Sequence, residues 1–138
     1  MFKKILFLGL VSGALAGIAS LVYANVYNSA LGTDFSQVAK PVGILAISLF
    51  SGMLACIAYY FITKWMKNKG EIVFNLVFVL LTFASILGPF ATKLPLTIDM
   101  PELFPGLTVP MHFFPALAWF TLKPLFIKPE KRSVYELV

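Results

Sequence analysis

Long segments without charge constrain this chain more than any other feature. Residues 5 to 27, 41 to 63 and 72 to 90 contain no Asp, Glu, Lys or Arg. A helix needs about 20 apolar residues to cross the hydrocarbon core of a bilayer. The whole chain is 59% hydrophobic and only 12% charged, whereas about 25% charged residues is usual in soluble domains. The sequence therefore predicts an all-α integral membrane protein.

We predict a single domain over residues 1–138, a bundle of four transmembrane helices at about 5–27, 41–63, 72–90 and 111–127. The first segment is kept as a span, since residues 5–22 are longer than the 7–15 residues of a signal-peptide core. Residues 25–40 are polar and form the first loop. Residues 91–110 hold four prolines, Pro95, Pro101, Pro105 and Pro110, which forbid a long regular helix. A long proline-rich loop is therefore expected there. Its alternating apolar side chains should rest on the bundle or the headgroups: Leu94, Leu96, Ile98, Met100, Leu103 and Phe104.

Basic residues set the orientation of these four spans. With four crossings, nine lysines and arginines fall on one side and only Lys40 and Lys93 on the other. Positively charged loops stay cytoplasmic, so both termini are predicted to lie inside and the proline-rich loop outside. The membrane expected for such a protein, from the family resemblance given below, is the inner (cell) membrane. The nine are Lys3, Lys4, Lys64, Lys67, Lys69, Lys123, Lys128, Lys131 and Arg132.

Small residues recur every four positions in the first two spans. Such spacing places them along one helix face, and in lipid a small face lets two helices approach closely. The ordinary interpretation is packing inside the bundle, and the alternative is a surface for self-association. In the first span, Gly9, Gly13 and Gly17 form one ridge of small residues, and a second ridge beside it holds Ser12, Ala16 and Ser20. The predicted packing residues are Gly9, Gly13, Gly17, Ser48 and Gly52.

Catalytic groups are scarce in this sequence. The chain has one Cys and one His, and Cys56 and His112 fall roughly 20 Å apart in depth when each span is drawn as a helix. No carboxylate falls within a span, which argues against a proton-coupled transporter. We therefore expect no enzyme, no catalytic residue, no metal, no cofactor and no nucleic-acid partner. Cys56 is expected to be a small packing residue.

An outer mouth is the best candidate for a ligand site. It would form where the end of the third span meets the start of the fourth, beneath the proline-rich loop. A histidine there titrates near neutral pH and can bind protons, metals or anionic groups; the alternative is a local hydrogen bond. The candidate residues are Ser85, Pro89, Asp99, Glu102 and His112.

The cytoplasmic lysines and arginines form a second candidate surface. Each basic residue near an anionic leaflet contributes on the order of 1 kcal/mol. We expect these residues to hold anionic lipid headgroups and to orient the protein, the alternative being a specific lipid-dependent switch. The residues of this predicted anionic-lipid face are Lys64, Lys67, Lys69, Lys131 and Arg132.

Three short motifs carry a family resemblance: a small-residue first span, a Ser-x-x-Gly-Pro end to the third span and a Met-His start to the fourth. These residues are Ser85, Gly88, Pro89, Met111 and His112. The chain resembles an uncharacterised family of small bacterial four-helix membrane proteins, although its proline-rich loop is longer than the family's connections. The resemblance implies a fold and a membrane location, and no activity.

Function is far less determined than architecture. We favour a non-enzymatic membrane component with a structural, regulatory or self-associating role, because a small packing face is present and a catalytic set is missing. Its expected partners are the bilayer, anionic lipids, and a second copy or another membrane protein. The alternative is a binder or carrier of a lipid, quinone or other apolar ligand. An elongated apolar cavity with His112 pointing into it would favour that alternative.

Overall fold

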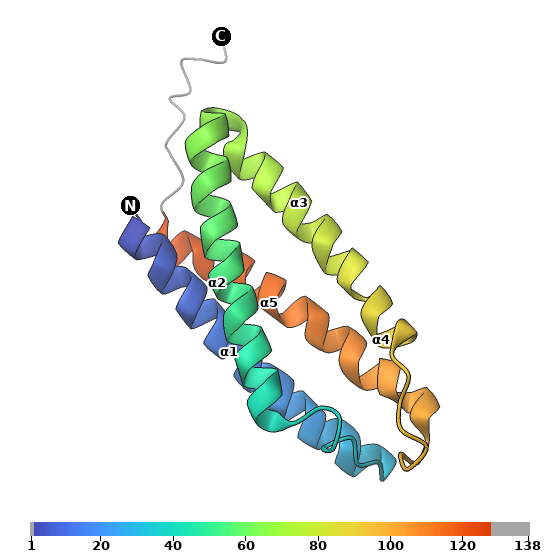
Figure 1. The fold of residues 1–138 in the computed structure, drawn as a ribbon. Helices are drawn as coiled ribbons and strands as arrows, with labels where there is room; N and C mark the ends of the chain where they lie inside the picture. Colours follow the sequence, from blue (N-terminus) through green and yellow to red (C-terminus); the bar gives the residue numbers. More distant parts are fainter. Residues whose placement is uncertain (1, 128–138) are drawn as a thin grey trace.

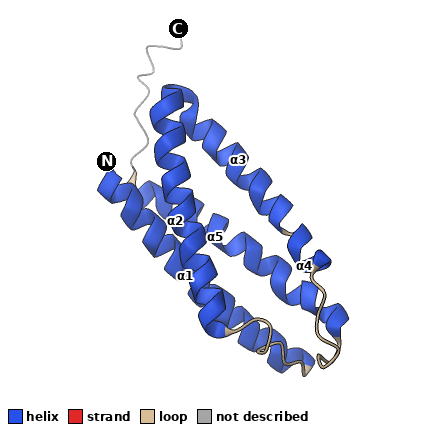
Figure 2. Ribbon diagram, in the orientation of Figure 1, coloured by secondary structure: helices blue, strands red, loops and turns tan. Residues whose placement is uncertain are grey.

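The computed structural model describes residues 2–127, and these form helices and loops without a strand (Figure 2). The α-helices are α1 (Phe2–Leu31), α2 (Pro41–Met66), α3 (Gly70–Ser85), α4 (Leu87–Ala91) and α5 (Phe104–Phe126). Two short 3-10 turns, η1 (Lys67–Lys69) and η2 (Pro101–Leu103), precede α3 and α5. The fold is all-α, as predicted.

Three helical segments in the described chain are long and apolar enough to cross a membrane: Phe2–Leu31, Pro41–Ala91 and Pro101–Phe126. The number predicted was four. The difference lies in Pro41–Ala91, which is one nearly continuous helical run of 51 residues. The backbone reverses inside it at Lys67, where φ is 46°, and Figure 1 shows α2 and α3 as the two arms of a hairpin. The rings of Tyr59 and Phe74 meet across the arms at 5.1 Å.

The end of α1 lies later than predicted. Residues 25–31 were assigned to a polar loop, but α1 continues to Leu31. It ends at Gly32, whose φ of +65° is the left-handed conformation that glycine adopts at least cost. The Thr33 N–H then donates to the Asn28 carbonyl at 3.1 Å. Polar residues such as Asn28 thus extend the helix beyond the apolar segment without ending it.

The proline-rich loop is also shorter than predicted, because α5 begins at Phe104 instead of residue 111. Pro105 sits in the first turn, where its missing N–H costs nothing. Pro110 removes the helical partner of the Gly106 carbonyl, and the Tyr23 hydroxyl donates to that carbonyl at 2.9 Å. The expectation that four prolines exclude a helix before residue 111 was therefore wrong.

The third predicted span, residues 72–90, is interrupted. Helix α3 stops at Ser85 and α4 resumes at Leu87. Pro89 explains the break, because a proline ring clashes with the carbonyl four residues earlier, here that of Ser85. Pro89 was expected to mark the end of the third span. Its effect falls four residues earlier, where it ends α3 at Ser85.

Helix α1 packs along α2 and α5, while α3 and α4 lie at the edge (Figure 1). Two separate hydrophobic clusters fix the bundle, one toward each end. One contains Ile5, Leu8, Ala55, Cys56, Tyr59, Phe74 and Trp119. The other contains Phe35, Ile98, Phe104 and Leu107.

The start of α1, the turn η1 and the end of α5 lie at one end of the bundle, which we name the basic end (Figure 1). The connection between α1 and α2 and residues 92–103 lie at the opposite end, the loop end. Described lysines at the basic end are Lys3, Lys4, Lys64, Lys67, Lys69 and Lys123. Those at the loop end are Lys40 and Lys93.

Candidate ligand-binding cavity

A cavity of about 670 Å³ lies between α2, α3 and α5, with one residue of α1 in its wall. This volume falls in the range of small-molecule sites, about 300–1,000 Å³. On α2 its lining extends from Ile44 to Ile62, which is about 27 Å along a helix at 1.5 Å per residue. The cavity is therefore elongated along the bundle.

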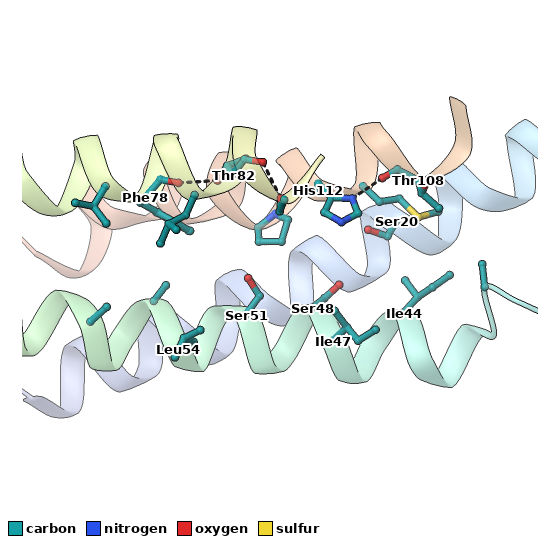
Figure 3. A pocket seen from close by; sticks show the side chains of 18 of the residues that line it. Ser20, Ile44, Ile47, Ser48, Ser51, Leu54, Phe78, Thr82, Thr108 and His112 are labelled. Atoms are coloured by element: carbon teal, nitrogen blue, oxygen red, sulfur yellow. Dashed lines mark hydrogen bonds between the residues drawn. The ribbon is translucent and has the colours of Figure 1, made fainter. Parts of the chain in front are cut away.

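The lining changes from polar to apolar along this length. Toward the basic end the lining residues that the structure describes are apolar: Leu54, Ala55, Ala58, Ile62, Phe74, Val77 and Phe78. The polar side chains of the described lining lie toward the loop end: Ser20, Lys40, Ser48, Ser51, Thr82, Ser85, Thr108 and His112. Figure 3 shows this gradient, with Leu54 and Phe78 at one end and His112 and Thr108 at the other. The cavity is amphipathic.

Three of the hydroxyl groups already donate within their own helices. Thr82 donates to the Phe78 carbonyl at 2.8 Å and Ser85 to the Thr82 carbonyl at 2.7 Å. Thr108 donates to the Phe104 carbonyl at 3.0 Å. Since a hydroxyl has a single proton, these oxygens can only accept a further hydrogen bond.

Three serines facing the same space have no hydrogen-bond partner among the described residues: Ser20, Ser48 and Ser51. Ser20 is 1% exposed and Ser48 6% exposed. In Figure 3 the hydroxyls of Ser48 and Ser51 point from α2 toward α3 and α5. None of these serine oxygens is among the sealed polar atoms without a partner in the described chain, which are Asn75 Oδ1 and Trp119 Nε1. The serine hydroxyls instead face the cavity, where they can bond a molecule that enters it.

His112 completes the polar half. Its Nδ1 lies 2.8 Å from the Thr108 carbonyl, which can only accept, so Nδ1 carries a proton. The ring extends from α5 into the space facing α2 (Figure 3). The local hydrogen bond that was weighed as an alternative to ligand binding thus occupies one nitrogen and leaves Nε2 for the cavity.

The five residues predicted for the outer mouth are only partly brought together. Ser85 and His112 line the cavity. Pro89 is buried in α4 and lies outside the lining. Asp99 and Glu102 fall in the connection before α5 and in η2, also outside it. Asp99 and Glu102 were included because the proline-rich loop was expected to cover the site. Instead, α5 begins at Phe104, and its first turns line the cavity with Phe104 and Thr108.

The predicted packing glycines lie between α1 and α2. A Cβ added at Gly13 would stand 2.8 Å from the Ser48 carbonyl oxygen, and one at Gly9 only 2.8 Å from the Cβ of Cys56. At Gly52 the added atom would collide with the Gly9 carbonyl oxygen. Gly17 faces Leu45. The small faces are thus used for contact inside this chain, and Cys56 is buried in the same contact.

At the basic end, Lys123 differs from its neighbours. The sequence analysis counted it among the basic residues of the cytoplasmic side, and in the structure its side chain is 9% exposed and pairs with Glu71 at 2.7 Å. Its ammonium also lies 5.0 Å from the centre of the Tyr59 ring. Lys64, Lys67 and Lys69 are exposed, while Lys131 and Arg132 lie outside the described residues.

Sequence analysis missed Ser20, Ser51 and Thr108 as wall residues. Ser20 had been grouped with a packing ridge because its spacing matched that of Ser12 and Ala16, yet Ser12 donates to the Gly9 carbonyl whereas Ser20 faces the cavity. The spacing of small residues shows that they share one face of a helix. It does not show at which residue the neighbouring helix moves away from that face and leaves a cavity. Within residues 2–127 no three His, Cys, Asp or Glu side chains form a group that could hold a metal ion.

The chain was compared with known proteins. No curated protein and no solved structure matches it. A family model described as a family of unknown function, DUF6069, matches residues 3–100. The matched part covers α1 to α4 and ends before α5, so it includes Ser85 and excludes His112. Because the match spans most of the chain, this protein belongs to the DUF6069 family, whose function is unknown.

Proposed function

We propose that this protein is a non-enzymatic membrane protein that binds a small amphipathic molecule in the cavity between α2, α3 and α5. The observation that carries the proposal is the change from polar to apolar lining along the cavity. A molecule with a polar head and an apolar tail matches such a wall when its tail lies toward Phe74 and its head toward His112. We favour this over the structural role that the sequence alone suggested.

The bound molecule would lie within a membrane. Helices α1, α2 and α5 are each long enough to cross, and residues 70–91, which comprise α3 and α4, would extend about 33 Å as a helix. Because α2 and α3 form a hairpin, we propose four crossings. The excess of lysines at the basic end favours a cytoplasmic position for it. On the resemblance noted above, we place the protein in a bacterial inner membrane.

The structural alternative loses part of its support. It relied on a small-residue face for association with a second copy or another protein. Gly9, Gly13 and Gly52 lie in the contact between α1 and α2, so association with a second copy or another protein would need another face. We also propose no role for a Cys–His pair, because Cys56 packs between α1 and α2, outside the cavity lining that contains His112.

The exposed lysines of the basic end support a second, auxiliary role. Lys64, Lys67 and Lys69 lie around the turn between α2 and α3, where the proposed topology places the anionic leaflet. We propose that they hold anionic lipid headgroups and keep the protein oriented.

Native mass spectrometry of protein extracted in mild detergent tests the binding proposal. Ala58 lies in the apolar half of the wall, so Ala58→Phe should fill the space that a tail needs. Ala30→Phe, at an exposed position near the end of α1, is the matched control. We expect a co-purified amphiphile with the wild type and with Ala30→Phe, and its loss with Ala58→Phe. Equal retention by all three proteins would contradict the proposal.

A further inference from the structure

We infer that the polar end of the bound molecule carries a neutral hydroxyl group, and that this hydroxyl donates to Nε2 of His112. The inference rests on the proposed function, because it names the head of the molecule whose tail the cavity would hold. It is carried by the hydrogen-bonding inventory at the loop end of the cavity, where the wall offers one distinctive acceptor and several unused hydroxyls.

The acceptor is fixed by a contact on the far side of the ring. Nδ1 of His112 donates to the Thr108 carbonyl, so in the neutral imidazole Nε2 has no proton and presents a lone pair. Thr82 and Ser85 add acceptor capacity alone, because their protons are committed to backbone carbonyls. A ligand that brings an O–H donor satisfies this side of the wall.

Other hydroxyls of the wall can supply donors. Ser20 on α1 and Ser48 on α2 are nine-tenths or more buried, and both line the cavity. A serine hydroxyl of this wall can donate to a lone pair of a ligand oxygen. A hydroxyl both donates and accepts, so it satisfies His112 and the serines together. An ether or carbonyl oxygen only accepts and would leave Nε2 unpaired, at the cost of a buried unsatisfied group.

Charged heads match this wall less well. Among the described residues that line the cavity there is no carboxylate, so an ammonium head would find no counter-charge in this part of the wall. Lys40 is the lysine found among the described lining residues, and it is exposed, so its ammonium can reach water. A carboxylate head has no proton to give to Nε2 of His112, because both groups only accept.

Matched ligands that differ at the head alone test this inference. The probes are 1-tetradecanol against its methyl ether, and 4-octylphenol against its methyl ether, which separate an aliphatic from an aromatic hydroxyl. Equimolar pairs compete for the protein in detergent, and native mass spectrometry reports the ratio bound. We expect about a tenfold preference for the hydroxyl in at least one pair, the effect of one buried hydrogen bond. Myristate is a third competitor, and we expect it to bind more weakly than 1-tetradecanol.

Variants assign the preference to His112. His112→Phe should reduce the ratio to about one while both probes still bind, and His112→Gln, which keeps an acceptor, should restore a preference. Equal binding of hydroxyl and ether by the wild type would overturn the head assignment and leave tail binding intact. A preference that survives His112→Phe, or tighter binding of myristate, would overturn the role of Nε2. Failure of every probe to bind would contradict the proposed function as well.

Discussion

Lys123 on α5 and Glu71 on α3 form an ion pair of 2.7 Å at the basic end of the bundle, and the lysine is the buried member. The two helices run antiparallel, and the pair joins the end of one to the start of the other. Phe83 and Phe113 pack further along the same two helices at 5.5 Å. The pair therefore helps to set the register in which α3 and α5 form two walls of the cavity.

Removing Glu71 should be more harmful than removing both charges. Glu71→Gln leaves the buried Lys123 ammonium without a counter-charge, and we expect a loss of about 1–3 kcal/mol in unfolding free energy. This is less than the 3–5 kcal/mol of fully buried pairs, since Glu71 is half-exposed. Glu71→Gln with Lys123→Met should recover most of the loss. Thermal unfolding in detergent measures both, and equal stability of single and double variants would contradict a buried uncompensated charge.

Gly13 should tolerate no side chain. Its added Cβ would meet the backbone of Ser48 and Leu49 at 2.8 and 2.9 Å, which cannot move without separating α1 from α2. We expect Gly13→Ala to destabilise the protein by about 1–3 kcal/mol. Gly43→Ala is the matched control, because nothing lies within 4 Å of its added Cβ; it should stabilise α2 by about 0.5–1 kcal/mol. Indistinguishable unfolding of the two variants would show that the α1–α2 contact is looser than described.

Tyr23 should contribute more to stability when residue 110 is proline than when it is alanine. Tyr23→Phe removes the hydroxyl that donates to the Gly106 carbonyl, at a cost of about 0.5–1.5 kcal/mol. In a Pro110→Ala background the helix regains its own N–H donor for that carbonyl, so we expect the cost of Tyr23→Phe to fall by about half or more. Tyr27→Phe, which affects the Leu103 carbonyl, should cost the same in both backgrounds. A double-mutant cycle on unfolding free energy measures this, and additive effects of Tyr23 and Pro110 would contradict the compensation.

The all-α class and the approximate positions of the long helices follow from uncharged length, which the sequence shows directly. Helix ends follow less directly. The apolar segment ends near Tyr27, but the helix continues to Leu31 and stops at Gly32. A helix ends where its last carbonyls find other hydrogen-bond donors, and this point need not coincide with the fall in hydropathy. Pro110 was expected to exclude a helix, yet it lies inside α5. Its effect depends on Tyr23, which lies 87 residues earlier in the chain and donates to the carbonyl that Pro110 leaves without a helical partner.

The candidate site could be predicted only in part. His112 and Ser85 were chosen because polar residues at helix ends in an apolar chain are conspicuous, and both line the cavity. Asp99 and Glu102 were conspicuous for the same reason and lie elsewhere. Ser20, Ser48 and Ser51 could not be separated from ordinary packing residues, because the divergence of α3 from α2 depends on the tertiary arrangement of the hairpin.

The most direct test of the central claim locates the ligand tail with Trp119. This side chain is fully buried and packs 5.5 Å from Phe74 and 6.2 Å from Phe78, both at the apolar end of the cavity. Ser48 and Ala58 are ten residues apart on α2, about 15 Å, so a head near Ser48 places the end of a long tail at this level. Trp65→Phe removes the exposed tryptophan and leaves Trp119 as the reporter.

In that background, 14-bromo-1-tetradecanol should quench Trp119 fluorescence strongly, because the bromine on the last carbon reaches the apolar end. The isomer 2-bromo-1-tetradecanol should quench it weakly, and Ala58→Phe should abolish quenching by the first compound. The reverse order of quenching would place the head at the apolar end. No quenching by either isomer would show that the cavity does not hold the tail, and would contradict the account.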